Sequence, residues 1–421
     1  MDAWLAGAIF VAVYVLIASE RVDRTLVALL GGLAVVVLGI IDQHEAFAAI
    51  DLNVIFLLAG MMVMAGTLGR TGFFEWLAIR AAKLSRGDPF RLLVVFAVIT
   101  AGLSAVLDNV TTVVLITPVV LSVSRRLGIP PGPYLVSEIL ASNIGGTATL
   151  IGDPPNILIG SAARLDFTSF LVNLAPVTLL VLVAVIATLR WLFRGELRVP
   201  DEQREALLEL REGEAIRDRR LLAISLTVIA ATLVGFLFHA ALGLEAATIA
   251  LLGATVLLLV ARIDPHEALR QVEWSTLFFF VGLFMLIAAV VRVGIVGGIA
   301  DVLARATEGQ ATVAAIALLW FSAIASAVVD NIPYVATAIP IVQRLTSDGL
   351  PAGPLWWALA LGACLGGNLT IVGASANVVV AGMASRAGHP IRFTQFLRYG
   401  AIVVGESVAI STVYLWARYL A

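Results

Sequence analysis

The sequence has few charged residues and almost no cysteine. Only 13% of its 421 residues are Asp, Glu, Lys or Arg, whereas 60% are hydrophobic. A soluble domain usually has about a quarter charged residues. The single cysteine, Cys364, excludes an internal disulfide framework and a multi-cysteine metal site. A formal net charge of −2 without a long basic run argues against a nucleic-acid partner. This composition is typical of an integral membrane protein.

Long apolar segments predict an all-α polytopic membrane protein. A membrane-spanning helix needs roughly 20 mostly apolar residues, and about ten segments meet this requirement. They lie at 3–19, 24–41, 52–69, 134–163, 170–193, 220–241, 245–262, 274–292, 354–385 and 395–418. The first apolar run is not preceded by the basic segment of a secretory signal, so we expect it to remain as the first spanning helix.

Two further apolar stretches, 89–127 and 311–345, each contain an Asp-Asn pair near the middle. An Asp in the centre of a spanning helix is costly because it has to be buried in hydrocarbon. A helical hairpin that enters and leaves on the same side would instead place the pair at its tip. We therefore predict two re-entrant hairpins, with Asp108-Asn109 and Asp330-Asn331 at their tips.

The two halves of the chain are related by sequence, which is the first thing to test in a chain of this kind. Asp108-Asn109 recurs as Asp330-Asn331, an offset of 330 − 108 = 222, and Gly152 recurs as Gly373, an offset of 373 − 152 = 221. Further pairs in this register are Gly60 with Gly282, Gly72 with Gly294, Pro118 with Pro340, and Asn156 with Asn377. We predict a first inverted repeat at 1–193, a cytoplasmic linker at 194–219 and a second inverted repeat at 220–421.

Each half has an odd number of expected crossings, so the second half should be inverted relative to the first. Arg and Lys residues are concentrated in cytoplasmic loops, which sets the orientation. With the N-terminus outside, the first-half cytoplasmic loops hold Arg21, Arg24, Arg70, Arg80, Lys83, Arg86, Arg91, Arg125 and Arg126. We expect both termini outside, in a bacterial inner membrane. Segments 73–86 and 295–307 should lie in the membrane interface.

Inverted repeats with broken helices place the substrate site at the bilayer midplane. Gly and Pro are dense in 142–156 and 366–377, which predicts that two spanning helices are broken there. The candidate substrate- and ion-binding residues are Asp108, Asn109, Thr111, Thr112, Asn143, Gly145, Gly146, Thr147, Gly152, Asp153, Asn156, Asp330, Asn331, Gly366, Gly367, Asn368, Thr370, Gly373, Ser375 and Asn377. Their oxygens suit Na⁺, a hard cation, with Asp108, Asn109, Asp330 and Asn331 as its candidate ligands. A buried Asp can instead bind a proton.

Structural roles compete with these functional ones. Asp108 and Asp330 can serve as N-caps of the second hairpin arms. The glycines can serve close helix packing. Asp153 has Ala374 as its counterpart, so the architecture of the repeat does not require an acid there. Cys364 is interpreted as a small packing residue rather than a metalloid ligand.

The motifs at these positions resemble a known group of membrane proteins. They are Leu107-Asp108-Asn109-Val110-Thr111-Thr112 with Pro118, Asn143 to Gly146, Gly152 to Asn156, Gly362 to Asn368, and Ala374 to Val378. Over nearly its whole length the chain resembles the ion transporter superfamily, in its arsenite-permease and sodium–proton antiporter branch, with the pigmentation P protein and its bacterial relatives. The resemblance implies a homodimer with a scaffold and a mobile transport domain that moves as an elevator. It also implies one ion site at each hairpin tip and the adjacent unwound loop.

The resemblance and the tip residues lead to three functional hypotheses. Dicarboxylate symporters of the superfamily have Ser-Asn-Thr at these tips, whereas both tips here begin with Asp, which repels a dianion unless a proton or cation neutralises it. We therefore predict proton- or Na⁺-coupled export of a small inorganic solute such as arsenite. The alternatives are Na⁺/H⁺ antiport and Na⁺-coupled transport of a carboxylate or other anion.

Other classes of protein are less well supported by the sequence. An enzyme is not expected, because no nucleophile–base pair or metal-ligand set occurs at membrane depth. A channel sharing this fold remains as a further alternative. No cofactor is expected beyond Na⁺ or H⁺ as the coupling ion. The expected partners are the solute and the lipid bilayer, and an associated ATPase subunit remains open.

Overall fold

A computed structural model describes residues 2–19, 21–86, 88–195, 197, 214–306 and 309–421. Within these ranges the regular elements are all helices, as the sequence predicts. Most of the predicted linker, at 198–213, lies outside the described residues, and the boundaries of the repeats at 193 and 220 stay predictions.

The helices of the first half follow the predicted order. They are α1 (Asp2–Ser19), α2 (Arg24–Val37), α3 (Gln43–Ala48), α4 (Leu52–Arg70), α5 (Phe73–Leu84), α6 (Pro89–Ser104), α7 (Asn109–Arg126), α8 (Gly132–Thr147), α9 (Pro154–Ala163), α10 (Phe167–Asn173) and α11 (Ala175–Leu192).

The second half repeats this order. Its helices are α13 (Arg219–Phe238), α14 (Ala246–Ala261), α15 (Pro265–Leu269), α16 (Trp274–Arg292), α17 (Ile295–Ala306), α18 (Ala311–Val328), α19 (Asn331–Ser347), α20 (Ala352–Gly366), α21 (Ser375–Arg386), α22 (Phe393–Leu415) and the terminal π-helical turn η2 (Trp416–Leu420).

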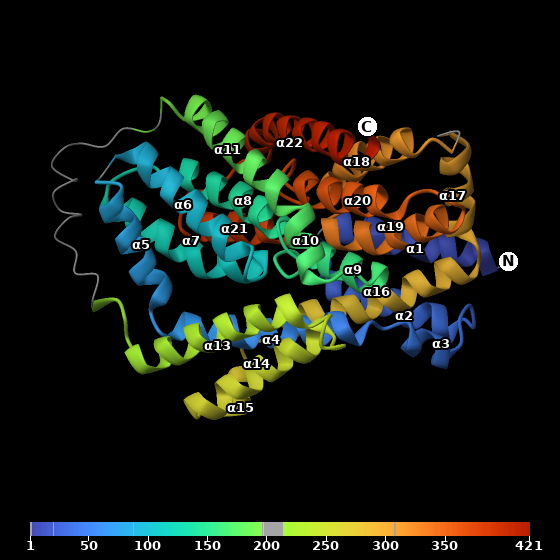
Figure 1. The fold of residues 1–421 in the computed structure, drawn as a ribbon, viewed down its shortest axis with the longest axis horizontal. Helices are drawn as coiled ribbons and strands as arrows, with labels where there is room; N and C mark the ends of the chain where they lie inside the picture. Colours follow the sequence, from blue (N-terminus) through green and yellow to red (C-terminus); the bar gives the residue numbers. More distant parts are fainter. Residues whose placement is uncertain (1, 20, 87, 196, 198–213, 307–308) are drawn as a thin grey trace.

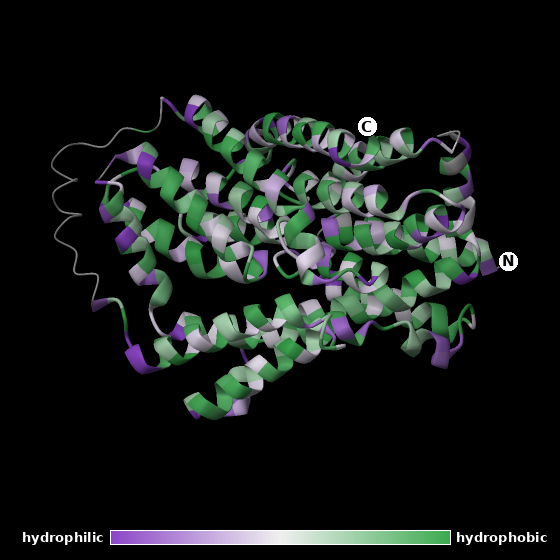
Figure 2. Cartoon of the chain, in the orientation of Figure 1, coloured by the Kyte–Doolittle hydropathy of each residue, from purple (hydrophilic) through white to green (hydrophobic). Residues whose placement is uncertain are grey.

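Many of these helices are long and apolar enough to cross a membrane. Among the described residues, six have at least 18 residues and the required composition: α4, α11, α13, α16, α18, and α22 together with η2. Shorter apolar helices are Asp2–Ile17 and α2, α6, α14 and α20. Figure 2 shows hydrophobic residues along most helices, with hydrophilic residues mainly toward the two ends of the molecule. The chain is therefore an integral membrane protein.

Equivalent contacts in the two halves confirm their relationship. α2 packs along α16, and α4 packs along α14. A Cβ atom added to Gly282 would lie 2.4 Å from the carbonyl carbon of Ala28, and one added to Gly60 would lie 2.8 Å from that of Ala250. Since 60 + 222 = 282 and 28 + 222 = 250, the same close approach occurs twice. Only glycine allows the two backbones to meet at this distance.

The two halves run in opposite directions. α5 and α17, the segments predicted to lie in the interface, are at opposite ends of the long axis in Figure 1. Each follows a glycine with left-handed backbone, Gly72 at φ +81° and Gly294 at φ +82°. Along the same axis α8 precedes α9 from left to right, whereas α20 precedes α21 from right to left. This arrangement is the inversion that the odd number of crossings predicts.

The predicted hairpins and broken helices form the centre of the molecule. Each hairpin consists of two helices joined by a short turn, α6 with α7 and α18 with α19. The first arms pack on the broken helices, α6 on α8 and α18 on α20. α8 is buried from Pro133 to Thr147 and α20 from Pro354 to Gly366. The polar ends of these two helices are therefore shielded by protein on every side.

Candidate functional site

The aspartates at both hairpin tips cap the following helix. Asp108 Oδ1 accepts a hydrogen bond from the backbone N–H of Thr111 at 2.8 Å, and Asp330 Oδ1 accepts one from Ile332 at 3.1 Å. The capping role considered from the sequence is therefore confirmed for one oxygen of each carboxyl group. The second oxygens differ between the two tips.

At the first tip, several buried oxygens have no partner. They are Asp108 Oδ2, Asn109 Oδ1 and Thr112 Oγ1, none of which has a hydrogen-bond partner among the described residues. The three side chains are almost completely buried, with at most 2% of their surface exposed. Thr111 is partly exposed and contributes its backbone N–H to the cap. A buried acceptor without a partner is costly, so these oxygens favour uptake of a proton or cation.

At the second tip, the equivalent oxygen is fully paired. Asp330 Oδ2 accepts hydrogen bonds from Ser375 Oγ at 2.6 Å and from Arg24 Nη1 at 3.3 Å. Arg24 also donates to Ser375, and its guanidinium carbon lies 5.5 Å from the centroid of the Phe279 ring. The sequence indicates Arg24 only as one of the arginines of the cytoplasmic loops. The structure shows that it is half-buried and reaches the second tip.

Asp153 connects the two tips. Its carboxylate accepts hydrogen bonds from Asn109 Nδ2 at 3.0 Å and from Asn331 Nδ2 at 3.2 and 3.3 Å. The side chain is fully buried. Its counterpart in the second half is Ala374, so the centre of the site carries one acid without a symmetry mate. No basic side chain of the described residues forms an ion pair with it.

A chain of asparagine side chains crosses from one half to the other. Asn143 Nδ2 donates to Asn368 Oδ1 and to Asn377 Oδ1, both at 2.9 Å. Asn143 Oδ1 in turn accepts from Asn109 Nδ2 at 3.3 Å. The amides of both broken helices and the first tip are therefore parts of one hydrogen-bonded network.

Two asparagines satisfy the backbone carbonyls that the helix breaks set free. Asn156 Nδ2 donates to the carbonyl oxygens of Gly146, Thr147 and Thr149 at 2.8–3.4 Å. Asn377 Nδ2 donates to those of Gly367 and Thr370 at 2.7 and 2.9 Å. Such carbonyls have to be satisfied inside a membrane protein. Asn156 and Asn377 therefore hold the unwound segments together.

Most of the predicted glycines have a packing role. A Cβ on Gly145 would lie 2.1 Å from the carbonyl oxygen of Ala101, and one on Gly366 would lie 2.5 Å from Ala323 of the other hairpin. Gly146 approaches Gly152, and Gly367 approaches Gly373, across each break. The hydroxyls of Thr147 and Thr370 donate to backbone carbonyls, of Asn143 at 2.7 Å and of Ala327 at 2.6 Å respectively. The predicted residues thus come together, with side-chain chemistry concentrated on the acids and amides.

Three ionisable residues belong to this region but were not predicted as site residues. Arg24 is one, and Glu138 and Glu273 are the others. Glu138 is fully buried on α8, where Thr117 donates to its Oε1 at 2.8 Å and its Oε2 has no partner among the described residues. The sequence does contain a signal for Glu138, because an acid inside a predicted membrane span, here 134–163, is usually functional.

Glu273 immediately precedes the spanning helix α16 and lies within electrostatic reach of Asp108 at the first tip and of Arg24. Burial raises the pKa of the Glu273 carboxyl, the Asp108 carboxylate raises it further, and Arg24 lowers it. Thr276 donates to Glu273 Oε2 at 3.3 Å. Glu273 belongs neither to a hairpin nor to a broken helix, so the sequence gives no sign that it lies near Asp108 and Arg24.

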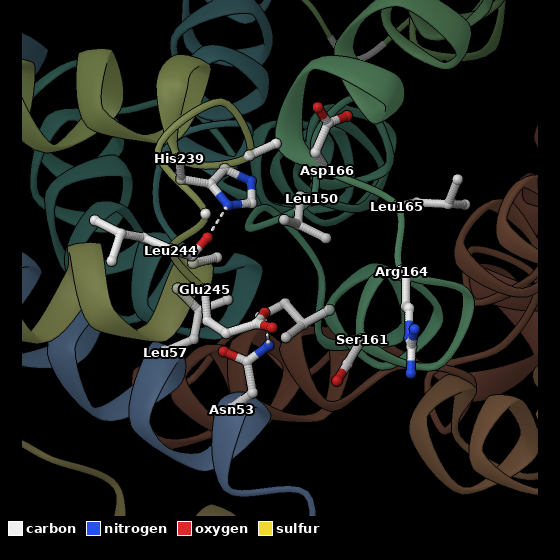
Figure 3. A pocket seen from close by; sticks show the side chains of 15 residues that line it. Asn53, Leu57, Leu150, Ser161, Arg164, Leu165, Asp166, His239, Leu244 and Glu245 are labelled. Atoms are coloured by element: carbon white, nitrogen blue, oxygen red, sulfur yellow. Dashed lines mark hydrogen bonds between the residues drawn. The ribbon is translucent and has the colours of Figure 1, made fainter.

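Two cavities approach the cluster from different sides. One, of about 410 Å³, is lined by Arg21, Arg24, Phe279, Asp330 and Ser375 among others, so it reaches the second tip directly. The other, of about 470 Å³, is shown in Figure 3, with Asn53, Leu150, Arg164, His239 and Glu245 on its walls. By the predicted orientation the first opens to the cytoplasm and the second to the outside. Leu150 belongs to the first helix break, so the unwound segment forms part of the outer cavity wall.

Re-entrant hairpins and broken helices that meet in a buried polar cluster define a membrane transporter. The chain belongs to the citrate transporter family (CitMHS), which it matches over residues 14–362. It is 48% identical over 422 residues to an uncharacterized transporter of Mycobacterium tuberculosis, covering 99% of this chain and 98% of the relative. It is 35% identical over 501 residues to the human P protein, covering 99% of this chain and 60% of that longer protein.

A solved structure shares the fold. The YdaH transporter of Alcanivorax borkumensis superposes with a TM-score of 0.59 at 16% identity, over 99% of this chain and 98% of that one. The similarity to the P protein, indicated by the motifs at the tips and breaks, is confirmed. The narrower placement in the arsenite-permease and sodium–proton antiporter branch stays a prediction.

Proposed function

We propose that this protein is a cation-coupled secondary transporter in which a proton or a Na⁺ ion binds at the first hairpin tip. The observation that supports this proposal is the group of partnerless buried oxygens on Asp108, Asn109 and Thr112. Oxygens of carboxylate, amide and hydroxyl groups are the ligands that hard cations prefer. A bound cation or proton would also remove the cost of burying the Asp108 charge.

The predicted cargo is a small inorganic solute such as arsenite, exported in exchange for the coupling cation. Neutral arsenious acid carries hydroxyl groups, which both donate and accept hydrogen bonds. The amides of Asn143, Asn331 and Asn368 carry both functions next to the tips, and a cargo there would exchange hydrogen bonds with those that these amides now make to one another and to Asp153. Exchange of Na⁺ for protons without another solute uses the same cation site and is the simplest variant of the proposal.

A carboxylate is a second candidate cargo, and a specific observation favours it. The cavity that reaches the second tip carries the Arg24 guanidinium, which is a good partner for a carboxylate. Arg24 also neutralises Asp330, which weakens the electrostatic argument against an anionic substrate. The description of the family as citrate transporters points in the same direction.

The proposal includes an elevator movement in a homodimer, as the resemblance to the superfamily implies. The way the helices group supports it: α2 and α4 pack mainly on α16 and α14, whereas the hairpin arms pack on the broken helices. The first group would form the scaffold and the second would carry the site across the membrane.

The test uses the purified chain in proteoliposomes under an imposed pH gradient and then a Na⁺ gradient. Uptake of arsenite, ²²Na⁺ and citrate is followed in turn, with Asp108→Asn as the site variant and Asp301→Asn, an exposed acid on α17, as the control. Gradient-driven arsenite movement that is lost only in the site variant supports the leading cargo. Exchange of Na⁺ for protons alone supports Na⁺/H⁺ antiport, and movement of citrate alone supports carboxylate transport. Movement of none of them under either gradient contradicts cation-coupled transport.

A further inference from the structure

The two hairpin tips are equivalent in sequence but different in charge. Asp108 and Asp330 occupy matching positions, and each caps its helix through one carboxyl oxygen. The other oxygen is without a partner at the first tip, whereas at the second tip it is bound by Arg24 and Ser375. Because the two tips share one architecture, what differs is the group that satisfies this second oxygen.

Arg24 begins helix α2 and is held in place by the packing of α2 on α16, outside the hairpins and broken helices. Thr25 Oγ1 donates to the carbonyl oxygen of Ser275 at 3.0 Å, which fixes the start of α2 against the start of α16. The Arg24 guanidinium lies over the Phe279 ring and reaches Asp330 at 3.3 Å. The pair is partly shielded, with 11% of the Asp330 side chain exposed and 33% of the Arg24 side chain exposed. A guanidinium in this position supplies a positive charge and donors at the place where a bound cation would supply charge alone.

The first tip has no such cation. The position equivalent to Arg24 in the second half is 24 + 222 = 246, and residue 246 is Ala246. The position equivalent to Ser375 in the first half is 375 − 221 = 154, which is Pro154. Among the described residues, Asp108 forms no ion pair. Arg24 and Ser375 therefore occur in only one of the two repeats and are not among the residues that the repeats share.

We infer that Arg24 acts as a tethered cation that fills the cation position of the second tip, so that a cation from solution binds only at the first tip. This inference rests on the proposed cation coupling and specifies how many of the two tips bind a cation from solution. Removal of the guanidinium should expose an oxygen site on Asp330 and Ser375 that takes a monovalent alkali cation.

The test counts ²²Na⁺ bound per chain at pH 8.5, where protons compete least, by equilibrium binding to the purified full-length protein. Arg24→Gln should bind one Na⁺ more than the wild type, whatever the wild-type number is. Arg24→Lys keeps the charge and should bind the wild-type number. Arg21→Gln, which removes another arginine of the same cavity, should also leave the number unchanged. The double variant Arg24→Gln/Asp330→Asn should lose the additional ion.

An Arg24→Gln protein that binds no additional Na⁺ overturns the inference, and so does a gain in Arg21→Gln. If Arg24→Gln does not elute as a monodisperse protein, Asp330→Asn alone decides. It should keep the wild-type number of bound Na⁺, whereas loss of one ion would show that Asp330 already holds a cation from solution. If transport by the wild-type protein did not depend on a proton or Na⁺ gradient, the proposed function would be contradicted instead. Failure of the inference and failure of the proposed function are therefore distinguishable.

Discussion

The side-chain amide of Asn331 lies 3.2 Å from the carboxylate of Asp153, a residue of the other half of the chain. Asn109 donates to the same carboxylate from the first tip at 3.0 Å. One buried acid therefore connects both hairpin tips, although the repeat has only an alanine at the equivalent position, Ala374. Such an acid can respond to the occupancy of either tip.

Replacing Asp153 by Ala, which copies the second half, should abolish coupled transport. The Asn331 amide would lose its acceptor and the Asn109 amide would keep only Asn143, at a cost of about 1–3 kcal/mol for a buried donor left unpaired. Asp153→Asn keeps the shape and an acceptor oxygen, so it should fold with a higher melting temperature than Asp153→Ala but still transport poorly. Gradient-driven flux and thermal unfolding of both variants would be compared. Wild-type flux in Asp153→Asn would show that the negative charge is dispensable.

The close approach of hairpin and broken helix gives a prediction about stability. Gly145→Ala would place a methyl group 2.1 Å from the Ala101 carbonyl oxygen, so α6 and α8 would have to separate. We expect a loss of about 1–3 kcal/mol in unfolding free energy, as is usual for overpacking. Gly102→Ala, on the facing hairpin arm α6 and with nothing within 4 Å, is the matched control and should be neutral or stabilising. Thermal unfolding in detergent measures both, and equal melting temperatures for the two variants would refute this packing role.

The sequence predicts the helices well because hydrophobic length and Gly-Pro density act locally. It places the two tips and the two breaks correctly, since the repeat fixes their register. It does not predict the Arg24–Asp330 contact, which joins residues 306 positions apart and has no counterpart in the other half. The same limit applies to Glu138, whose pairing with Thr117 depends on how α7 and α8 pack. Side-chain pairing between elements follows from packing, which a local pattern does not encode.

Glu138 offers a test of how the protein tolerates a buried acid. Its only hydrogen bond among the described residues is from Thr117, and a charged carboxylate with an unpaired oxygen would be costly in this apolar interior. Glu138→Gln removes the charge and keeps the size, so we expect an unfolding free energy within about 1 kcal/mol of the wild type or above it. Glu138→Ala leaves a cavity and should cost about 2–5 kcal/mol, by analogy with other large-to-small core changes. Thermal unfolding of the two variants gives the comparison. A Gln variant as unstable as the Ala variant would mean that the carboxylate is charged and paired in the folded protein.

Thr112 separates a role in cation binding from a role in folding. Its hydroxyl is buried at the first tip and has no hydrogen-bond partner among the described residues, so Thr112→Val, which is nearly isosteric, should not lower the melting temperature. If the hydroxyl oxygen is a ligand of the coupling cation, its loss should raise the cation concentration for half-maximal transport about tenfold, which corresponds to about 1.4 kcal/mol. Thr100→Val is the matched control, because Thr100 is equally buried and equally without a partner but lies in α6 away from the tip. Both variants would be measured for thermal unfolding and for cation dependence of flux in proteoliposomes. The same half-maximal concentration in both variants would remove Thr112 from the cation site and leave Asp108 and Asn109 as its remaining tip ligands.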